Sequence, residues 1–173
     1  MQRGEGIGRM SAFLRLFGAG TIALSALIMS RAYAVFIRRR VAEYRSLLGF
    51  LELMRREMLS CLCTPSELAE RCSDTILTEI GFLEALRSGR GTAAAFSEIR
   101  SSLHIAVEDA DVLQNFFEKF GRGTMESELS SLDECIRRFS AVAIAEEEGA
   151  SAAIRLAGTL LALCAIGIVI LLL

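Results

Sequence analysis

The last eighteen residues of the chain, 156–173, form an apolar run without a single charged side chain (LAGTLLALCAIGIVILLL). As an α-helix, this run would be about 27 Å long, close to the ~30 Å thickness of the hydrocarbon core of a bilayer. A helix buried in a soluble domain normally keeps a polar face toward water, and this run has none. The sequence therefore predicts a transmembrane helix at residues 156–173.

A second apolar segment lies at residues 13–36, after a short tail of residues 1–12. Its charge-free centre spans residues 16–30, and the flanking Arg15 and Arg31 can extend toward the lipid head groups, which lengthens the usable span. The segment predicts a transmembrane helix or signal anchor. A cleaved signal peptide is the alternative, because Ala32-Tyr33-Ala34 has the small-x-small form of a cleavage site. The arginines at 31 and 38–40 weigh against that alternative.

Basic residues near the two apolar segments are distributed unevenly. More of them lie on the side of residues 37–155 than on the opposite side: Arg31, Arg38, Arg39, Arg40, Arg45 and Arg155 against Arg3, Arg9 and Arg15. Because arginine-rich flanks stay on the cytoplasmic side of a membrane, we expect residues 37–155 to face the cytoplasm. The five cysteines include no CxxC pair and no zinc-binding spacing, which fits reduced thiols in that compartment.

Residues 37–155 show helical periodicity and contain the one proline of the chain. Apolar residues three and four apart predict an amphipathic helix at 42–62, continuous or nearly continuous with the first apolar segment. Thr64, Pro65 and Glu67 then form a capping-box pattern, with a cap hydroxyl, a proline at the first helical position and a carboxylate that reaches back. This pattern predicts a short helix that ends near residue 71. A third helix is expected at 75–86, ending before Gly89 and Gly91.

The second half of this region is predicted to contain three further helices. One is expected at 93–103 and another at 109–120, which would stop at the break formed by Phe120, Gly121 and Gly123. From residue 125 the helical pattern continues to the end, with a seam for a partner helix at Leu129, Leu132, Ile136, Phe139 and Ala143. The three glutamates at 146–148 are expected to form a solvated turn. The predicted fold is all-α, a compact helical bundle flanked by an N-terminal and a C-terminal transmembrane helix.

No residue pattern in the sequence points to catalysis. His104 is the single histidine, and no cysteine or carboxylate stands at a recognisable spacing from it. The glycines on either side of Arg122 lack the lysine and serine of a phosphate-binding loop. We therefore expect no enzyme activity and no catalytic, cofactor-binding or metal-binding residue, and the net charge of −2 gives no reason to expect a nucleic acid partner. Small residues at Gly158, Ala162 and Ala165 predict a contact between membrane helices.

Taken together, these features resemble the stage III sporulation protein AB family of endospore-forming bacteria. The resemblance covers nearly the whole chain. Its most specific parts are the helix at 47–58 (LLGFLELMRREM), Thr64-Pro65 with an acidic residue after it, the Phe120-Gly121 break and the apolar ending at 156–173. The family pattern usually has a second Leu-Gly and an Asp after the Phe-Gly, and then a Gln. Here the segment 123–128 is shorter, and Glu128 stands near the place of that Gln.

The resemblance implies a structural role, because the family's domain is similar to the cytoplasmic domains of the platform protein of type II secretion systems. It implies a non-catalytic scaffold subunit of a secretion-like channel complex between mother cell and forespore, required after engulfment. The chain would lie in the mother-cell membrane around the forespore, with its domain facing the cytoplasm. Its implied partners are a secretion-type ATPase and other membrane proteins of the complex, and a homo-oligomer is a further option. The alternative that follows from residues 32–34 is an exported, tail-anchored envelope protein.

Overall fold

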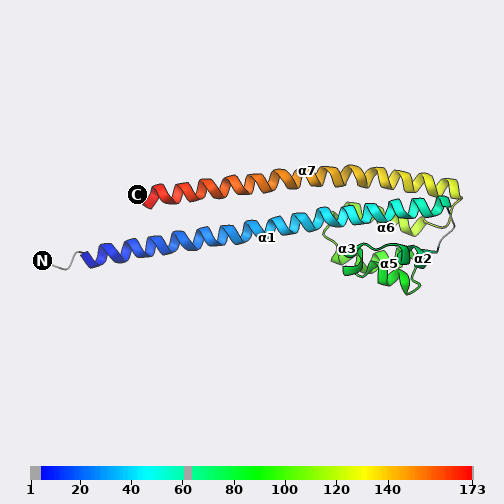
Figure 1. Cartoon of the computed structure of the whole chain (residues 1–173), viewed down its shortest axis with the longest axis horizontal. Helices are drawn as coiled ribbons and strands as arrows, with labels where there is room; N and C mark the ends of the chain where they lie inside the picture. The colour runs from blue at the N-terminus through cyan, green and yellow to red at the C-terminus, as the bar shows by residue number, and fades with distance from the viewer. Residues whose placement is uncertain (1–4, 61–63, 173) are drawn as a thin grey trace. The chain divides into compact units, whose positions relative to one another are not determined.

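The computed structural model describes the backbone of residues 5–60 and 64–172, and toward the two ends it describes side chains at some positions only. The elements in these ranges are helices (Figure 1): α1 (Glu5–Ser60), α2 (Pro65–Arg71), α3 (Thr75–Glu79), α4 (Phe82–Arg87), α5 (Thr92–Ile99), the 3-10 helix η1 (Arg100–Ser102), α6 (Val107–Lys119) and α7 (Met125–Leu172). The predicted all-α class is confirmed. The chain divides into a bundle unit, Arg38–Glu148, and a terminal unit, Met1–Ile37 with Gly149–Leu173. The sequence-based boundaries at 36/37 and 155/156 stay predictions.

The amphipathic helix expected at 42–62 is the C-terminal part of α1, which also contains the first apolar segment. Its buried stripe consists of Tyr44, Leu47, Phe50, Leu51 and Met54, each at most 3% exposed. These positions recur every three or four residues, so one face of the helix forms the base of the core. Residues 61–63, which include two of the five cysteines, lie outside the described residues.

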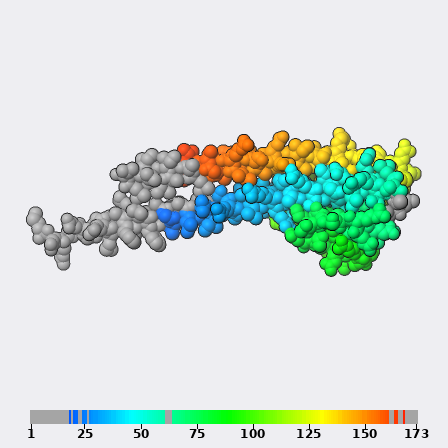
Figure 2. Space-filling view, viewed as in Figure 1, coloured from blue at the N-terminus to red at the C-terminus, as the bar shows by residue number. Residues whose placement is uncertain are grey.

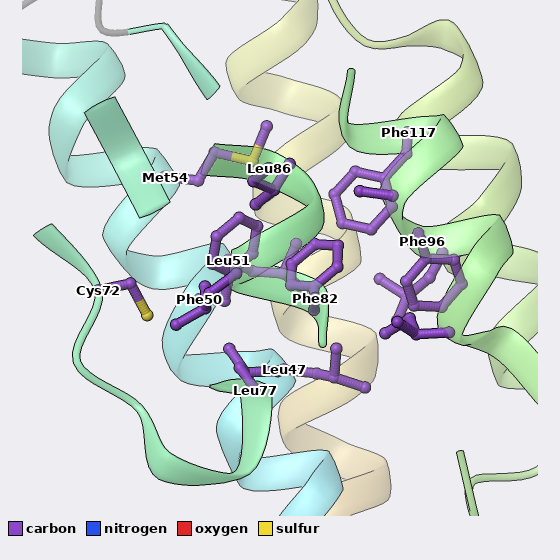
Figure 3. Close-up of a cluster of buried hydrophobic side chains, with 14 of the residues drawn as sticks. Leu47, Phe50, Leu51, Met54, Cys72, Leu77, Phe82, Leu86, Phe96 and Phe117 are labelled. Atoms are coloured by element: carbon purple, nitrogen blue, oxygen red, sulfur yellow. The ribbon is translucent and has the colours of Figure 1, made fainter. Parts of the chain in front are cut away.

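Four phenylalanines from four helices meet at the centre of the bundle unit. Phe50 of α1 lies edge-on to Phe82 of α4, with ring centroids 5.0 Å apart and an interplanar angle of 78°. Phe96 of α5 and Phe117 of α6 complete the group, with centroids 5.3 Å apart. Figure 3 shows these rings together, with aliphatic side chains around them. In Figure 2 the short helices (green) form a lobe against the cyan part of α1. Helices this short are not stable alone, so the shared core holds them in place.

The helix predicted at 75–86 is in fact two helices, α3 and α4. Gly81 has a left-handed backbone conformation (φ +83°), and it separates the two. A glycine adopts this conformation without steric cost, so the chain can turn here inside an apolar stretch. Asp74 begins α3, because its carboxylate accepts a hydrogen bond from the Leu77 N–H at 2.9 Å. The turn lets both Leu77 and Phe82 enter the core, where neither is exposed.

The solvated turn predicted at 146–148 is wrong, because these glutamates lie within α7. Within the bundle unit, Figure 1 shows the first part of α7 (yellow) beside α1 (cyan), and three ion pairs join them: Arg40–Glu146, Arg45–Glu147 and Arg55–Asp133. Arg40 and Arg45 of α1 thus pair with Glu146 and Glu147, and α7 continues through all three glutamates. The predicted seam faces the core, with Leu132, Phe139 and Ala143 buried and Leu129 and Ile136 half-buried.

In the terminal unit, the large apolar side chains that the structure describes are mostly exposed. Leu24 is 59% exposed, Met29 75% and Leu163 64%. Within the described residues, no helix contains a stretch with the length and hydropathy needed to cross a membrane. Many side chains of the segments predicted as anchors, 13–36 and 156–173, are outside the described set. The two transmembrane helices therefore stay a prediction.

Candidate functional site

A groove of about 840 Å³ lies between α6 and the start of α7. Its α6 wall is a single helix face, because Val112, Asn115, Phe116 and Lys119 follow the i, i+3, i+4, i+7 spacing. The α7 wall is formed mainly by small and charged side chains: Ser127, Glu128, Ser130, Ser131, Glu134 and Arg138. The groove thus has one mixed wall, where Val112 and Phe116 alternate with Asn115 and Lys119, and one mainly polar wall.

Aromatic side chains connect this groove to the core. Phe116 and Phe120 are half-buried, with ring centroids 5.7 Å apart, and the Phe116 ring lies 5.4 Å from the buried Phe117. From α7, the buried Cys135 contributes a thiol. Burial raises the pKa of the Cys135 thiol from 9.0 to about 11. The thiol is therefore uncharged at neutral pH. An uncharged thiol can pack against apolar groups, but it is a poor nucleophile.

The turn between α6 and α7 is held by one carboxylate. Gly121 adopts the left-handed conformation (φ +84°). Glu128 accepts hydrogen bonds from the backbone N–H groups of Gly121 at 2.9 Å and Gly123 at 2.8 Å. A Cβ atom at Gly123 would come within 3.2 Å of the Glu128 Oε1 atom, so a glycine suits this close approach. The predicted break residues Phe120, Gly121 and Gly123 thus come together at the end of the groove. The sequence placed Glu128 near this turn without revealing its bonds to the backbone.

The charges along the groove differ in how well they are paired. Glu134 pairs with Arg137, and Arg138 lies 3.5 Å from a carboxylate oxygen of Asp109. In contrast, the exposed Lys119 and Arg122 make no ion pair or side-chain hydrogen bond with the residues that the structure describes. Both stand close to the turn at 120–123. This end of the groove therefore presents two cations without a described ion-pair partner, together with the Glu128 carboxylate and the half-buried Phe120.

A separate polar cluster ties the segment before α6 to α1. The Glu43 side chain has no exposed surface, and it accepts hydrogen bonds from the His104 backbone N–H at 2.6 Å and from Arg39 Nε at 3.2 Å. The same carboxylate also contacts the His104 ring, with Glu43 Oε1 2.8 Å from His104 Nδ1. Arg39 also binds Glu79 at 2.7 Å. Because several donors satisfy the buried carboxylate, the cluster stabilises the contact between α1 and the segment before α6.

Tyr44 adds a second tie next to Glu43. Its hydroxyl donates to the Asp109 carboxylate at 2.7 Å and accepts from the Ala106 N–H at 3.0 Å. Burial, more than any other influence, raises the pKa of Tyr44 above its ordinary value. The sequence showed no carboxylate at a recognisable spacing from His104, so it did not predict the contact with Glu43. The sequence feature that could have indicated these contacts was Glu43, which directly precedes the apolar stripe of α1.

The capping residues Thr64, Pro65 and Glu67 lie at the start of α2. The Thr64 hydroxyl accepts from the Glu67 N–H at 3.4 Å, and the Glu67 carboxylate accepts from the Thr64 N–H at 2.8 Å. This backbone hydrogen bond lowers the pKa of Glu67. Pro65 is the first residue of the helix. The capping box therefore has a structural role and lies apart from the groove lining.

The predicted membrane-helix contact at Gly158, Ala162 and Ala165 falls in the C-terminal part of α7. Gly158 is exposed, with open space where a Cβ atom would be. The side chains of Ala162 and Ala165 lie outside the described residues. Among the side chains that the structure describes, no group of three or more His, Cys, Asp or Glu residues could hold a metal ion.

Comparison with known proteins connects this helical fold to a family. A family model of stage III sporulation protein AB matches residues 15–173, which include the bundle unit, the groove, all of α7 and α1 from residue 15 onward. Comparisons with curated proteins and with solved structures gave no match. The family name implies a role in stage III of sporulation. Because the match extends over nearly the whole chain, this protein belongs to the stage III sporulation protein AB family.

Proposed function

We propose that this chain is a non-catalytic membrane platform subunit of a secretion-like complex between mother cell and forespore, needed after engulfment. In this proposal, residues 13–36 and 156–173 anchor the chain in the mother-cell membrane, and the bundle unit faces the cytoplasm. The platform holds a secretion-type ATPase near the membrane components of the complex. The family membership supports the part of the proposal that concerns stage III sporulation.

The observation that carries the proposal is the arrangement of the two long helices. α1 contains an apolar segment and the buried base of the bundle, and α7 contains the seam of the bundle and the other apolar segment. Each predicted anchor is thus part of a helix that also builds the core. This continuity suits a domain that is fixed to a membrane at both ends.

The described polar clusters also favour a structural role over catalysis. Glu43 and His104 form the most acid–base-like pair, but the carboxylate is fully buried and already bound by several donors. Cys135 is held as a neutral thiol by burial, which raises its pKa to about 11. These groups stabilise the bundle, and a platform requires a stable surface that partners can bind.

The proposal is tested by deletion of the gene in a spore-forming host. We expect deletion to arrest forespores after engulfment, and we expect the intact chain supplied in trans to restore heat-resistant spores. A chain that lacks residues 156–173 should fail to restore them. Normal yield of heat-resistant spores in the deletion strain would refute the platform function.

The alternative function is an exported, tail-anchored envelope protein, and Ala32-Tyr33-Ala34 is the feature that favours it. Intact-mass measurement of the protein isolated from cells separates the two. The platform proposal expects a product that retains residues 13–36. A product that begins at residue 35 would favour the alternative and remove the N-terminal anchor.

A further inference from the structure

We propose that the groove between α6 and α7 binds an acidic amphipathic helix of a partner protein. The inference rests on the proposed platform function, because a platform acts through the proteins that bind to it. It adds to that function a specific binding surface and the shape and charge of the partner segment that binds there. The argument uses residues of the bundle unit only.

The volume of the groove is compatible with a bound helix. A helix with side chains is about 10 Å wide and rises 5.4 Å per turn, so one turn occupies roughly 400 Å³. The groove volume of about 840 Å³ is comparable to the volume of about two turns of helix. The described residues offer no β-strand to which an extended peptide could add, and a helix laid into a groove is a mode of peptide recognition that two helix walls can support.

The walls offer the two features that a docked helix needs. On α7, Ser127 and Ser131 are one helical turn apart and exposed, and small side chains at this spacing let a second helix approach closely. On the other wall, Phe116 and Phe120 are half-buried, so they are held by the core and still present ring surface to the groove. Rigid aromatic side chains of this kind often contribute much of the energy of an interface.

The charges select an acidic ligand. The groove is lined by three cations and two carboxylates, namely Lys119, Arg122 and Arg138 with Glu128 and Glu134. Glu134 pairs with Arg137, and the carboxylate of Glu128 is engaged by backbone N–H groups of the turn, so the two cations near the turn outnumber the one carboxylate beside them. Lys119 and Arg122 have no described ion-pair partner. The positive end of the groove contrasts with the net charge of −2 of the whole chain and is complementary to glutamate or aspartate side chains on the ligand.

The test is site-specific photo-crosslinking of the full-length protein in sporulating cells. A photoreactive amino acid replaces the exposed Ser131 in the groove, and a matched chain carries it at the exposed Glu52 of α1. Crosslinked peptides are identified by mass spectrometry. We expect the probe at position 131, and not the probe at position 52, to label an amphipathic segment with acidic residues in another protein.

Charge reversal then tests the recognition itself. Lys119→Glu combined with Arg122→Glu should lower the crosslinked fraction by tenfold or more, because two attractions become repulsions. Arg56→Glu is the matched control, since Arg56 is an exposed cation elsewhere on the bundle unit, and it should leave crosslinking unchanged. Replacing the labelled acidic residues of the partner with lysine should restore crosslinking to the double variant. If the double variant melts at a lower temperature than the parent, Lys119→Gln with Arg122→Gln removes the charges without reversing them.

Several outcomes would overturn the inference. These are crosslinking to lipid or to a second copy of this chain alone, absence of a crosslink at position 131, and a crosslink that persists at the parental level after charge reversal. None of these outcomes affects the platform function, which is judged by spore yield in the deletion strain. Conversely, normal sporulation without the gene would refute the platform function whatever occupies the groove.

Discussion

Apolar side chains meet opposite environments in the two units of this chain. In the bundle unit, Leu77, Phe82 and Phe139 have no exposed surface. In the terminal unit, Met29 is 75% exposed and Leu163 64%. The difference lies in the neighbouring residues. Helices of the bundle unit carry charges on one face and pack their apolar face against one another, whereas the apolar segments at 16–30 and 156–173 have no charged face.

This comparison explains why hydropathy alone does not describe the chain. Burial of apolar surface stabilises a fold by about 25 cal/mol per Å², and the bundle unit obtains this stabilisation from its own core. The exposed side chains of the terminal unit do not obtain it in the same way. Large exposed apolar surfaces mark sites of contact with a membrane or another protein, which accords with the proposed anchors.

The largest expected effect on stability comes from shortening one apolar side chain in each unit. Phe82→Ala should lower the free energy of unfolding by about 3–5 kcal/mol, because Phe82 is fully buried among the rings of Phe50, Phe96 and Phe117. Leu24→Ala, at a position 59% exposed, is the control and should change it by less than about 0.5 kcal/mol. Denaturant unfolding of the full chain in detergent measures both. Equal losses would show that the two units do not differ as described.

A second effect concerns the buried polar tie. Glu43→Ala should destabilise the bundle by about 1–3 kcal/mol, because the His104 backbone N–H and the Arg39 side chain lose a buried acceptor. Glu79→Ala removes another partner of Arg39, but Glu79 is 53% exposed, so we expect a much smaller loss. Thermal unfolding of the two variants provides the comparison. If Glu79→Ala is as destabilising as Glu43→Ala, burial does not determine the strength of this cluster.

The helix cap should have a smaller effect. Thr64→Ala is expected to cost about 1 kcal/mol, because the Glu67 N–H loses its acceptor at the start of α2. Thr64→Ser retains the hydroxyl and should remain close to the parent. Urea unfolding can resolve a difference of this size. An unchanged midpoint for Thr64→Ala would mean that the cap does not contribute to stability.

The last effect is confined to alkaline pH. The folded state holds the Cys135 pKa at about 11, above its ordinary value of 9.0, because burial disfavours the thiolate. Between these values the unfolded chain loses the proton first, so stability is fully present below pH 9 and falls as the pH rises toward 11. Cys135→Ala removes this contribution, whereas Tyr44, which also titrates at high pH, is common to both proteins. We expect the stability advantage of the parent over the variant to shrink across this range, and a constant difference would argue against burial of the thiol.

The sequence was most informative where structure depends on neighbouring residues. Thr64, Pro65 and Glu67 lie close together in the chain, so their capping geometry could be predicted from the sequence alone. The break at Gly121 follows in the same way from a glycine after an apolar helix. Gly81 was missed because apolar residues on both sides maintain the helical pattern through it.

The remaining features depend on residues far apart in sequence. Glu43 and His104 are separated by 61 positions, and Arg40 and Glu146 by 106, so no local spacing could pair them. The glutamates at 146–148 were predicted as a turn for this reason. The groove could not be predicted either, because its two walls come from α6 and from the first turns of α7. Sequence could indicate its aromatic and glycine residues, but not the wall that faces them.

The most direct test of the central claim is photolabelling of the protein in native membranes with a lipid that carries a diazirine on its acyl chain. Labelled peptides are mapped by mass spectrometry. If the apolar ends contact lipid and the bundle unit does not, label should appear in peptides from residues 13–36 and 156–173 and be absent from the core helices between 44 and 139. Absence of label from both ends, or equal labelling of the bundle, would contradict a platform anchored in the membrane at both ends.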